Sequence, residues 1–255
     1  MNTKIERLLM LSLTALSLAA CAPARHSTSL TSAELAARPE TFSPPGGEDF
    51  EFPVFEEETQ MTGNERPGDS IPLLDSQGRK PAAWDGRAPD AAKFTELTEK
   101  ALDTWGGQIL EIIPRDIETF CPKYAALGRE ARKGFWLMLI SAMAKFESGF
   151  RTVVFFKEDF SNSKGEPVVS RGLLQISSES ANGFGCGIER EVDLHDPAVN
   201  LACAVRILNR TVTRDGVITA RDDRWHGGAR YWSVLRMPRT LNPIQKTTRS
   251  IASCT

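Results

Sequence analysis

The sequence predicts a mainly helical domain of the α+β class over residues 91–255, with one small β-hairpin. Three observations predict this class. Apolar residues recur at helical spacing in segments 91–105 and 193–212. Residues 135–147 form an apolar run of the length expected for a buried helix. A β-like run at 152–156 is followed by turn-forming residues 161–165 and by two valines, which is typical of a hairpin.

The helix expected over residues 135–147 is apolar on nearly every side, which is typical of a helix buried in a domain or crossing a membrane. Ser141, Lys145 and Glu147 interrupt the run, so it is shorter than the roughly 20 apolar residues that a bilayer requires. We therefore expect the core helix of the domain, with Gly149 as its stop. Pro114 predicts two short helices or a kink within residues 109–120.

The first 20 residues have the pattern of a signal peptide, with Lys4 and Arg7 before the apolar stretch 8–20. The segment 18–21 (LAAC) resembles a bacterial lipobox, which implies cleavage before Cys21 and lipidation of its sulfur. Ala22 after that cysteine implies sorting to the outer membrane. We expect an exported, lipid-anchored protein that faces the periplasm. The alternative is an ordinary secretory signal followed by a chance cysteine.

Residues 21–90 are expected to form an acidic, proline-rich tether. They hold 6 Lys/Arg and 13 Asp/Glu, a net charge of −7, without apolar periodicity. Such a composition buries too little apolar surface to offset the entropy lost on ordering. Residues 91–255 hold 23 Lys/Arg and 19 Asp/Glu, a net charge of +4, and the whole chain has an ordinary globular composition with 41% hydrophobic residues.

Glu147 is the candidate catalytic acid. Ile140, Met143 and Glu147 are spaced so that the carboxyl group lies on an apolar helical stripe. Burial disfavours its charged form, and the negative end of the helix dipole adds to that effect, so both should raise its pKa. A carboxylic acid that stays protonated near neutral pH serves as a general acid. The alternative is a solvent-facing glutamate at the rim of the domain.

The segment Glu147-Ser148-Gly149-Phe150, followed by 170–176 (SRGLLQI), resembles the lytic transglycosylase (SLT-domain) family of the lysozyme-like superfamily, which is similar to g-type lysozymes. Gly172 follows Glu147 by 25 residues (172 − 147 = 25), as in that family's pattern. Residues 196–201 (DPAVNL) resemble its D-P-x-x-N-I segment. The resemblance implies a lysozyme-like helical fold with the hairpin beside a catalytic cleft. It also implies substrate-binding roles for Ser148, Ser170, Gly172, Leu174, Gln175 and Tyr231.

Three of these assignments carry departures or alternatives. Leu174 stands where the family usually has methionine, and residues 229–233 (ARYWS) keep the tyrosine of its A-Y-N-A-G segment but not the rest. This departure suggests a divergent branch with an altered sugar preference. Gln175 either contacts the sugar or hydrogen-bonds backbone groups. Trp225, Tyr231 and Trp232 either stack on sugar rings or belong to the core. Residues 172–176 are expected to begin a helical segment.

A second carboxylate is a separate question, because glycosidases that use water need one near the acid. The loop between the two motifs carries three candidates, Glu158, Asp159 and Glu166. The alternative is that all three are solvated loop charges. His195 has no nearby second histidine or spaced carboxylate, so we expect neither a metal site nor a cofactor.

Five cysteines support export. Without Cys21, an even number remains, which in an exported protein predicts two disulfides with three possible pairings. We favour Cys186–Cys203 and Cys121–Cys254, the second of which joins the chain's end to the start of the domain.

The resemblance implies an enzyme that cleaves the β-1,4 bond between MurNAc and GlcNAc of peptidoglycan. The pairing of the Glu-Ser and GLLQI segments leads us to expect a lytic transglycosylase that leaves 1,6-anhydroMurNAc ends, a route for which one protein carboxylate suffices. The alternatives are a hydrolytic lysozyme with an altered acetylation preference and a non-catalytic wall-binding lipoprotein. The basic residues after position 205 suit an anionic glycan polymer. No nucleic-acid-binding motif is present, and we expect a monomer.

Overall fold

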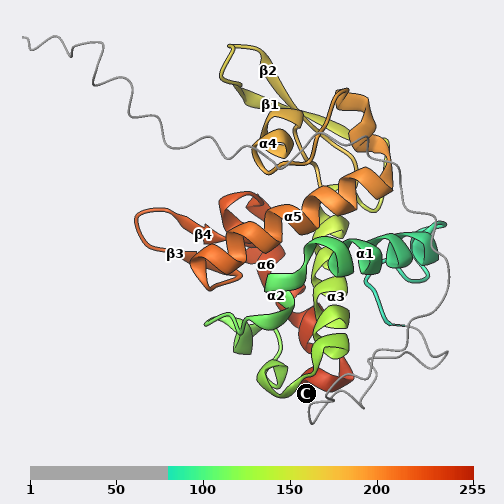
Figure 1. The fold of residues 1–255 in the computed structure, drawn as a ribbon, viewed down its shortest axis with the longest axis vertical. Helices are drawn as coiled ribbons and strands as arrows, with labels where there is room; N and C mark the ends of the chain where they lie inside the picture. The colour runs from blue at the N-terminus through green and yellow to red at the C-terminus, as the bar shows by residue number, and fades with distance from the viewer. Residues whose placement is uncertain (1–79) are drawn as a thin grey trace, which may run out of the picture. The chain divides into compact units, whose positions relative to one another are not determined.

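The structure is a computed structural model of the whole chain, and it describes residues 80–255. The expected signal peptide, Cys21 and nearly all of the expected tether lie outside the described residues. The described part is mainly helical with two small antiparallel hairpins, which confirms the α+β class (Figure 1). No helix among residues 80–255 combines the length and the hydrophobicity that crossing a membrane requires.

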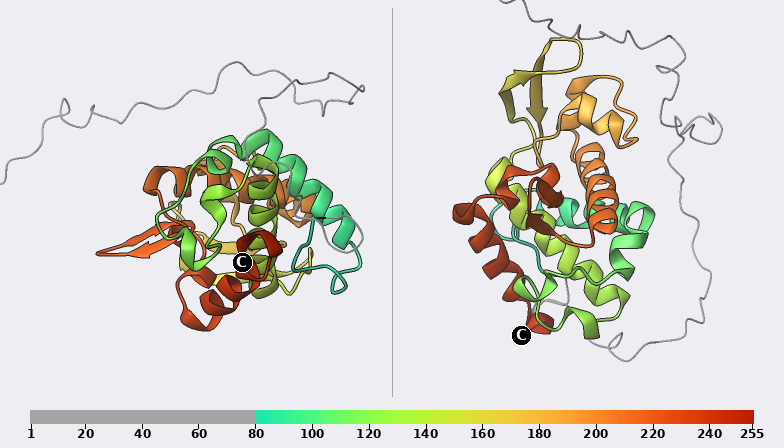
Figure 2. Two further views of the ribbon diagram at one scale, coloured as in Figure 1. Left: turned by 90° about the horizontal axis from the view of Figure 1, so that it is seen from below. Right: turned by 90° about the vertical axis from the view of Figure 1, so that its left-hand side faces the viewer.

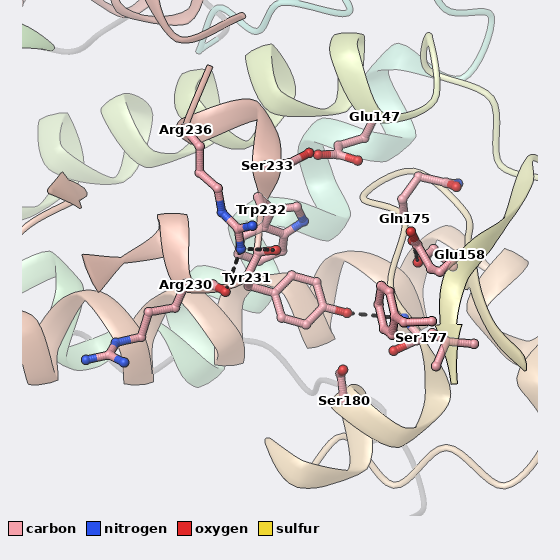
Figure 3. A pocket seen from close by; sticks show the side chains of 13 residues that line it. Glu147, Glu158, Gln175, Ser177, Ser180, Arg230, Tyr231, Trp232, Ser233 and Arg236 are labelled. Carbon is pink, nitrogen blue, oxygen red and sulfur yellow. Dashed lines mark hydrogen bonds between the residues drawn. The ribbon is translucent and has the colours of Figure 1, made fainter. Parts of the chain in front are cut away.

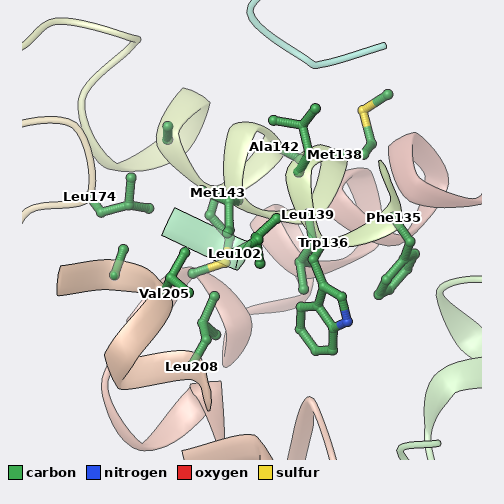
Figure 4. Close-up of a cluster of buried hydrophobic side chains, with 14 of the residues drawn as sticks. Leu102, Phe135, Trp136, Met138, Leu139, Ala142, Met143, Leu174, Val205 and Leu208 are labelled. Carbon is green, nitrogen blue, oxygen red and sulfur yellow. The ribbon is translucent and has the colours of Figure 1, made fainter. Parts of the chain in front are cut away.

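Helix α3 (Arg129–Glu147) is the buried centre of the domain. Helix α1 (Ala91–Trp105) packs on α5 (Pro197–Asp215), and α6 (Pro238–Arg249) packs on α3. Leu139 and Met143 of α3 meet Val205 and Leu208 of α5 in the core (Figure 4). The predicted central helix and its apolar character are confirmed. Its end is also as predicted, since α3 stops at Glu147 and Gly149 has a φ of 60°.

Pro114 separates helix α2 (Gly107–Glu111) from a short 3₁₀ turn, η2 (Ile117–Thr119), which confirms the predicted break. A second 3₁₀ turn, η3 (Tyr124–Ala126), precedes α3. Helix α5 begins with Pro197 in its first turn, where the missing N–H costs nothing. The side chain of Asp196 caps this helix by accepting a 2.8 Å hydrogen bond from the Ala198 N–H.

The predicted hairpin is present as β1 (Phe155–Ser161) and β2 (Pro167–Arg171). Its register shifts between Lys157 and Ser161, so residues 158–160 leave the regular ladder. The hairpin projects at one end of the domain, with α4 (Ser178–Gly183) beside it, and the C-terminus lies at the other end (Figure 2). A second hairpin joins β3 (Thr219–Arg221) to β4 (Trp225–Gly227). Four further 3₁₀ turns complete the domain: η4 (Glu191–His195), η5 (Gly228–Arg230), η6 (Ser233–Leu235) and η7 (Ala252–Cys254).

The helix expected to begin at residues 172–176 is not present. Gly172 and Gln175 have φ values of 73° and 46°, in the left-handed region that a helix does not use. The segment instead forms a tight turn closed by a bridge between Arg171 and Ile176, and helix α4 starts later, at Ser178. The apolar pattern of residues 173–176 arises because this turn is buried, not because it is helical.

The packed domain also starts earlier than residue 91. Ala82, Ala83 and Trp84, which the sequence analysis assigned to the tether, are part of the hydrophobic core. The Ala83 N–H donates a 2.8 Å hydrogen bond to Ser141 Oγ on α3. Residues 82–84 therefore belong to the domain.

Two disulfides close the domain, Cys121–Cys254 and Cys186–Cys203. These are the two pairings favoured from the sequence. The first joins the segment before α3 to the C-terminus across 133 residues, and the second joins the loop after α4 to α5 across 17 residues.

Candidate active site

A cavity of about 330 Å³ lies where the end of α3, the first hairpin and segment 230–236 meet. Its volume is within the range of small-ligand sites. Figure 3 shows the side chains of Glu147, Glu158 and Tyr231 around it. The residues that line the cavity are Glu147, Glu158, Phe160, Val168, Ser170, Gln175, Ser177, Ser180, Arg230, Tyr231, Trp232, Ser233 and Arg236.

Glu147 is held at this cavity by the last turn of α3. The pKa of its carboxyl group is raised to about 8: burial is the largest cause, the charge of Glu158 adds to it, and the charge of Arg236 opposes both. One carboxyl oxygen, Oε1, is buried without a hydrogen-bond partner. An ionised oxygen in that position would be costly, so the neutral acid is favoured. The predicted burial effect is present, and the charge of the neighbouring Glu158 is a second cause that the sequence did not predict.

Glu158 is the one candidate second carboxylate that lines the cavity. It is half-buried in the irregular part of β1, and Ser170 Oγ on β2 donates a 2.6 Å hydrogen bond to its Oε1. Asp159 is exposed and does not line the cavity. Glu166 is exposed near the hairpin tip, where its Oε2 accepts a hydrogen bond from Asn162 Nδ2. The structure therefore selects one of the three candidates that the sequence left open.

Three of the substrate-binding residues implied by the resemblance line the cavity: Ser170, Gln175 and Tyr231. The Gln175 Nε2 group donates hydrogen bonds to the carbonyl oxygens of Val154 and Gly172, at 3.1 and 2.8 Å. Its N–H donors are therefore used by backbone groups. Tyr231 Oη accepts a 3.2 Å hydrogen bond from the Ser177 N–H. Burial raises the pKa of Tyr231, which keeps its phenol protonated near neutral pH.

The other three, Ser148, Gly172 and Leu174, are buried and do not line the cavity. The side chain of Asn200 on α5 holds the turn that contains two of them. Its Nδ2 donates to the Arg171 and Leu194 carbonyls at 3.0 and 2.9 Å, and its Oδ1 accepts 2.9 Å from the Leu174 N–H. Gly172 and Leu174 therefore lie in a turn that Asn200 holds in place, outside the lining of the cavity.

Trp225 and Trp232, two of the three aromatic residues that could stack on a sugar ring, make contacts with other parts of the protein. Trp232 is buried and donates a 2.9 Å hydrogen bond to the Leu174 carbonyl, so it belongs to the core, although it reaches the cavity wall. Trp225 does not line the cavity, and the Arg221 guanidinium lies 5.1 Å from its ring centre. Arg236 also lines the cavity but was not predicted as a site residue. Its position depends on tertiary contacts that no local sequence motif indicates.

The two histidines among residues 80–255, His195 and His226, do not line the cavity. His195 Nδ1 lies 2.8 Å from the Thr152 carbonyl oxygen, a structural contact. Asp222, Asp223 and His226 bring their ligand atoms within 4.8 Å of one another on the second hairpin. Both aspartates are exposed and none of the three lines the cavity, and exposed acidic groups are common without a metal.

Fold and site together define a mainly helical protein with two internal disulfides and a carboxylic acid of raised pKa at an open cavity. The chain is similar to solved structures of DslA (Bd0314). The wild-type form shares 43% identity, with 70% of this chain and 100% of that chain covered and a TM-score of 0.67. The chain belongs to the family of DslA. Two glutamate-to-glutamine mutants of DslA also match, each at 42% identity, with TM-scores of 0.67 and 0.65. No protein-family description and no curated protein matches the chain.

Proposed function

We propose that the protein is a glycosidase that cleaves the β-1,4 bond between MurNAc and GlcNAc of peptidoglycan. The observation that carries the proposal is the carboxyl group of Glu147, which lines an open cavity and has a pKa of about 8. Such a group holds its proton at neutral pH and can give it to a glycosidic oxygen. The resemblance of residues 147–150 and 170–176 to the lytic transglycosylase family supplies the substrate class and a lysozyme-like fold.

The position of Glu158 favours hydrolysis as the outcome. In this route Glu147 gives its proton to the leaving oxygen as the C1–O bond breaks. Water attacks C1, and its proton passes to the Glu158 carboxylate, which releases it to solvent. Glu147 regains a proton from solvent before the next turnover. The second carboxylate that hydrolysis needs is thus available, held by the hydrogen bond from Ser170.

The DslA structures support the same pair of glutamates. The two substituted positions in that protein, 143 and 154, differ by 11, and Glu147 and Glu158 of this chain also differ by 11. With 43% identity between the chains, an equal spacing of two glutamates makes Glu147 and Glu158 their natural counterparts.

The lytic transglycosylase route is the second candidate, and the Glu-Ser and GLLQI segments at that family's spacing favour it. In this route the substrate's own acetamido group stabilises the cationic carbon. Glu147 then takes a proton from the O6 hydroxyl, and the 1,6-anhydro ring closes without water. Glu158 would have no chemical role in this route.

Cleavage of purified sacculi in ¹⁸O-labelled water distinguishes the two routes. Hydrolysis places one labelled oxygen at each new reducing end, whereas transglycosylation leaves unlabelled anhydro ends that are lighter by one water. Glu147→Gln should abolish cleavage, and Glu166→Gln, at the exposed hairpin tip, should not. Binding of glycan without cleavage by the wild-type chain would contradict the enzymatic proposal and favour a wall-binding protein.

We also propose that the protein acts outside the cytoplasm on a lipid anchor at Cys21. The two disulfides support an oxidising compartment. The lipobox-like segment 18–21 lies outside the described residues, so the anchor stays a prediction. Cys21→Ser should release the protein from the outer-membrane fraction into the soluble periplasm, and unchanged fractionation would contradict the anchor.

A further inference from the structure

Arg236 lies at the end of η6 and lines the same cavity as Glu147. Its Nε donates a 2.7 Å hydrogen bond to the Ala229 carbonyl, and its Nη2 donates to the carbonyls of Arg230 and Tyr231 at 2.9 and 3.4 Å (Figure 3). A guanidinium has five N–H donors in a rigid plane, so these bonds engage one edge and fix its orientation. The two N–H groups of Nη1 have no hydrogen-bond partner among residues 80–255.

Glu147 and Glu158 line the same cavity as Arg236, but neither carboxyl group is hydrogen-bonded to its guanidinium. The other cation that lines it, Arg230, turns its guanidinium away and bonds Asp215 at 2.6 and 3.2 Å (Figure 3). Glu147 is held in its neutral form by burial and so offers no counter-charge near pH 7. No ion pair joins Arg236 to an acidic residue within the described part of the chain.

A half-buried cation with a fixed orientation and two free donors is suited to an anion that enters with the ligand. Peptidoglycan offers carboxylates on its muramyl side and none on GlcNAc. They come from the lactyl ether of MurNAc where the stem peptide is absent, and from the stem peptide where it is present. An N–H group of Nη1 can donate a charge-assisted hydrogen bond to the carboxylate of either source.

We propose that Arg236 is a specificity-determining residue that binds a muramyl-side carboxylate of the substrate through the N–H groups of Nη1. This inference rests on the proposed function, since it names the anionic group that a peptidoglycan-cleaving site would recognise. It predicts that the cavity prefers muramyl glycans to uncharged chitin oligosaccharides of equal length. It also gives the unpaired positive charge a role in binding, separate from proton transfer by Glu147.

Two other roles are compatible with the same contacts and make different predictions. Arg236 could act only as a brace for the backbone of segment 229–231. Its loss would then weaken binding of every glycan equally. Alternatively, Arg236 could act only by lowering the pKa of Glu147. Its loss would then move the alkaline limb of the pH profile and leave ligand preference unchanged.

The test measures binding by calorimetry in the full chain carrying Glu147→Gln, so that no ligand is cleaved. Four glycans of one length are compared: peptide-free MurNAc–GlcNAc oligomers, the same oligomers with amidated carboxylates, chitin oligomers, and oligomers with stem peptides. We expect free lactyl carboxylates to tighten binding about 10- to 100-fold over the amidated oligomer, the range of a charge-assisted hydrogen-bonded pair. Tighter binding of the stem-peptide oligomer than of the peptide-free oligomer assigns the carboxylate to the peptide, and the reverse order assigns it to the lactyl group.

Adding Arg236→Gln should abolish the preference for free carboxylate while leaving the affinity for chitin oligomers within about twofold. Arg239→Gln is the matched control, because Arg239 is exposed on α6 and does not line the cavity. Equal affinity for the free and amidated oligomers, a preference that survives Arg236→Gln, or an equal loss for all four glycans would overturn the proposal.

A second measurement does not depend on the folding of the variant. In the Arg236-bearing protein, the NMR signal of its guanidinium should shift on adding the free-carboxylate oligomer and not on adding the amidated one. The absence of that difference also overturns the proposal. Binding in the Glu147→Gln chain requires no catalysis, so failure of the wild type to cut sacculi would sink the proposed function alone.

Discussion

Glu147 and Glu158 line one cavity from two different elements, helix α3 and strand β1, and their environments are unlike. Glu147 has a buried oxygen without a partner, whereas Glu158 accepts a 2.6 Å hydrogen bond from Ser170. The charge of Glu158 adds to burial in raising the pKa of Glu147. A pair whose environments differ in this way separates into an acid and a base.

The first prediction concerns the pH dependence of cleavage. In the proposed reaction Glu147 acts in its protonated form, and its pKa is about 8. Cleavage, measured as kcat/KM for the clearing of sacculi, should therefore be retained up to about pH 8 and fall about tenfold for each further pH unit. Circular dichroism at each pH controls for unfolding. A fall centred near pH 4.5 would show that Glu147 ionises like a free side chain.

The second prediction concerns the stability of the Glu147→Gln variant. The folded pKa lies above the ordinary value of 4.5, so the contribution of Glu147 to stability is greatest below that value and is lost as pH rises through about 8. Glutamine avoids the buried charge. The variant should match the wild type near pH 4 and exceed it by on the order of a few kcal/mol near pH 9, as measured by chemical denaturation. An unchanged difference between these pH values would contradict burial as the cause.

The third prediction separates Glu158 from its neighbours on the hairpin. Removing its charge in Glu158→Gln should lower the pKa of Glu147 and move the alkaline limb to lower pH. If water is the nucleophile, kcat should also fall by about 10²- to 10⁴-fold, the usual contribution of a general base. Asp159→Asn is the matched control, because Asp159 is exposed and does not line the cavity. Equal effects of the two variants would remove Glu158 from the mechanism.

The chain's local patterns predict most of its elements, because periodicity depends on which side of an element is buried. Helix α1 spans Ala91–Trp105, the range that its periodicity predicts, and Pro114 ends α2 as expected. The turn at 172–176 could not be told from a helix, since both bury Leu173, Leu174 and Ile176. The spacing of apolar residues indicates which positions are buried, but it does not indicate backbone angles such as the left-handed φ of Gln175.

The residues of the candidate site likewise fall into those that a local motif predicts and those that only the tertiary fold brings to the cavity. Glu147 and Gln175 carry a local motif and are predictable from the sequence, whereas the choice of Glu158 over Asp159 depends on the shifted register of β1. Arg236 is one of many arginines in its region. Its role follows from three backbone carbonyls placed around it by the tertiary fold, which no sequence spacing encodes.

The fourth prediction tests the turn that forms the cavity wall. A Cβ at Gly172 would collide with the Leu194 carbonyl oxygen and lie 2.5 Å from Asn200 Nδ2. Gly172→Ala should therefore lower the free energy of unfolding by on the order of 3 kcal/mol or more. Gly165→Ala is the matched control, because Gly165 also has a positive φ but open space around it, and it should cost about 1 kcal/mol. Equal losses would mean that strain in φ, and not the close approach, determines the cost at Gly172.

The fifth prediction tests whether residues 82–84 support the end of helix α3, which carries Glu147. Trp84 is fully buried, and its ring lies edge-on to Phe94 and to Phe150, with ring centres 5.6 and 6.5 Å apart. Phe150 follows Glu147 by three residues and has a strained φ of 66°, so the Trp84 ring packs against the segment that ends α3.

Trp84→Ala should therefore cost about 3–5 kcal/mol of unfolding free energy, as measured by chemical denaturation. It should also reduce cleavage, because loosening Phe150 lets Glu147 move relative to the cavity. Trp225→Ala is the control, since Trp225 is half-exposed on the second hairpin and should cost less. If the Trp84 variant loses no more stability than the control, residues 82–84 are a detachable tail, and the domain begins where the sequence alone would place it.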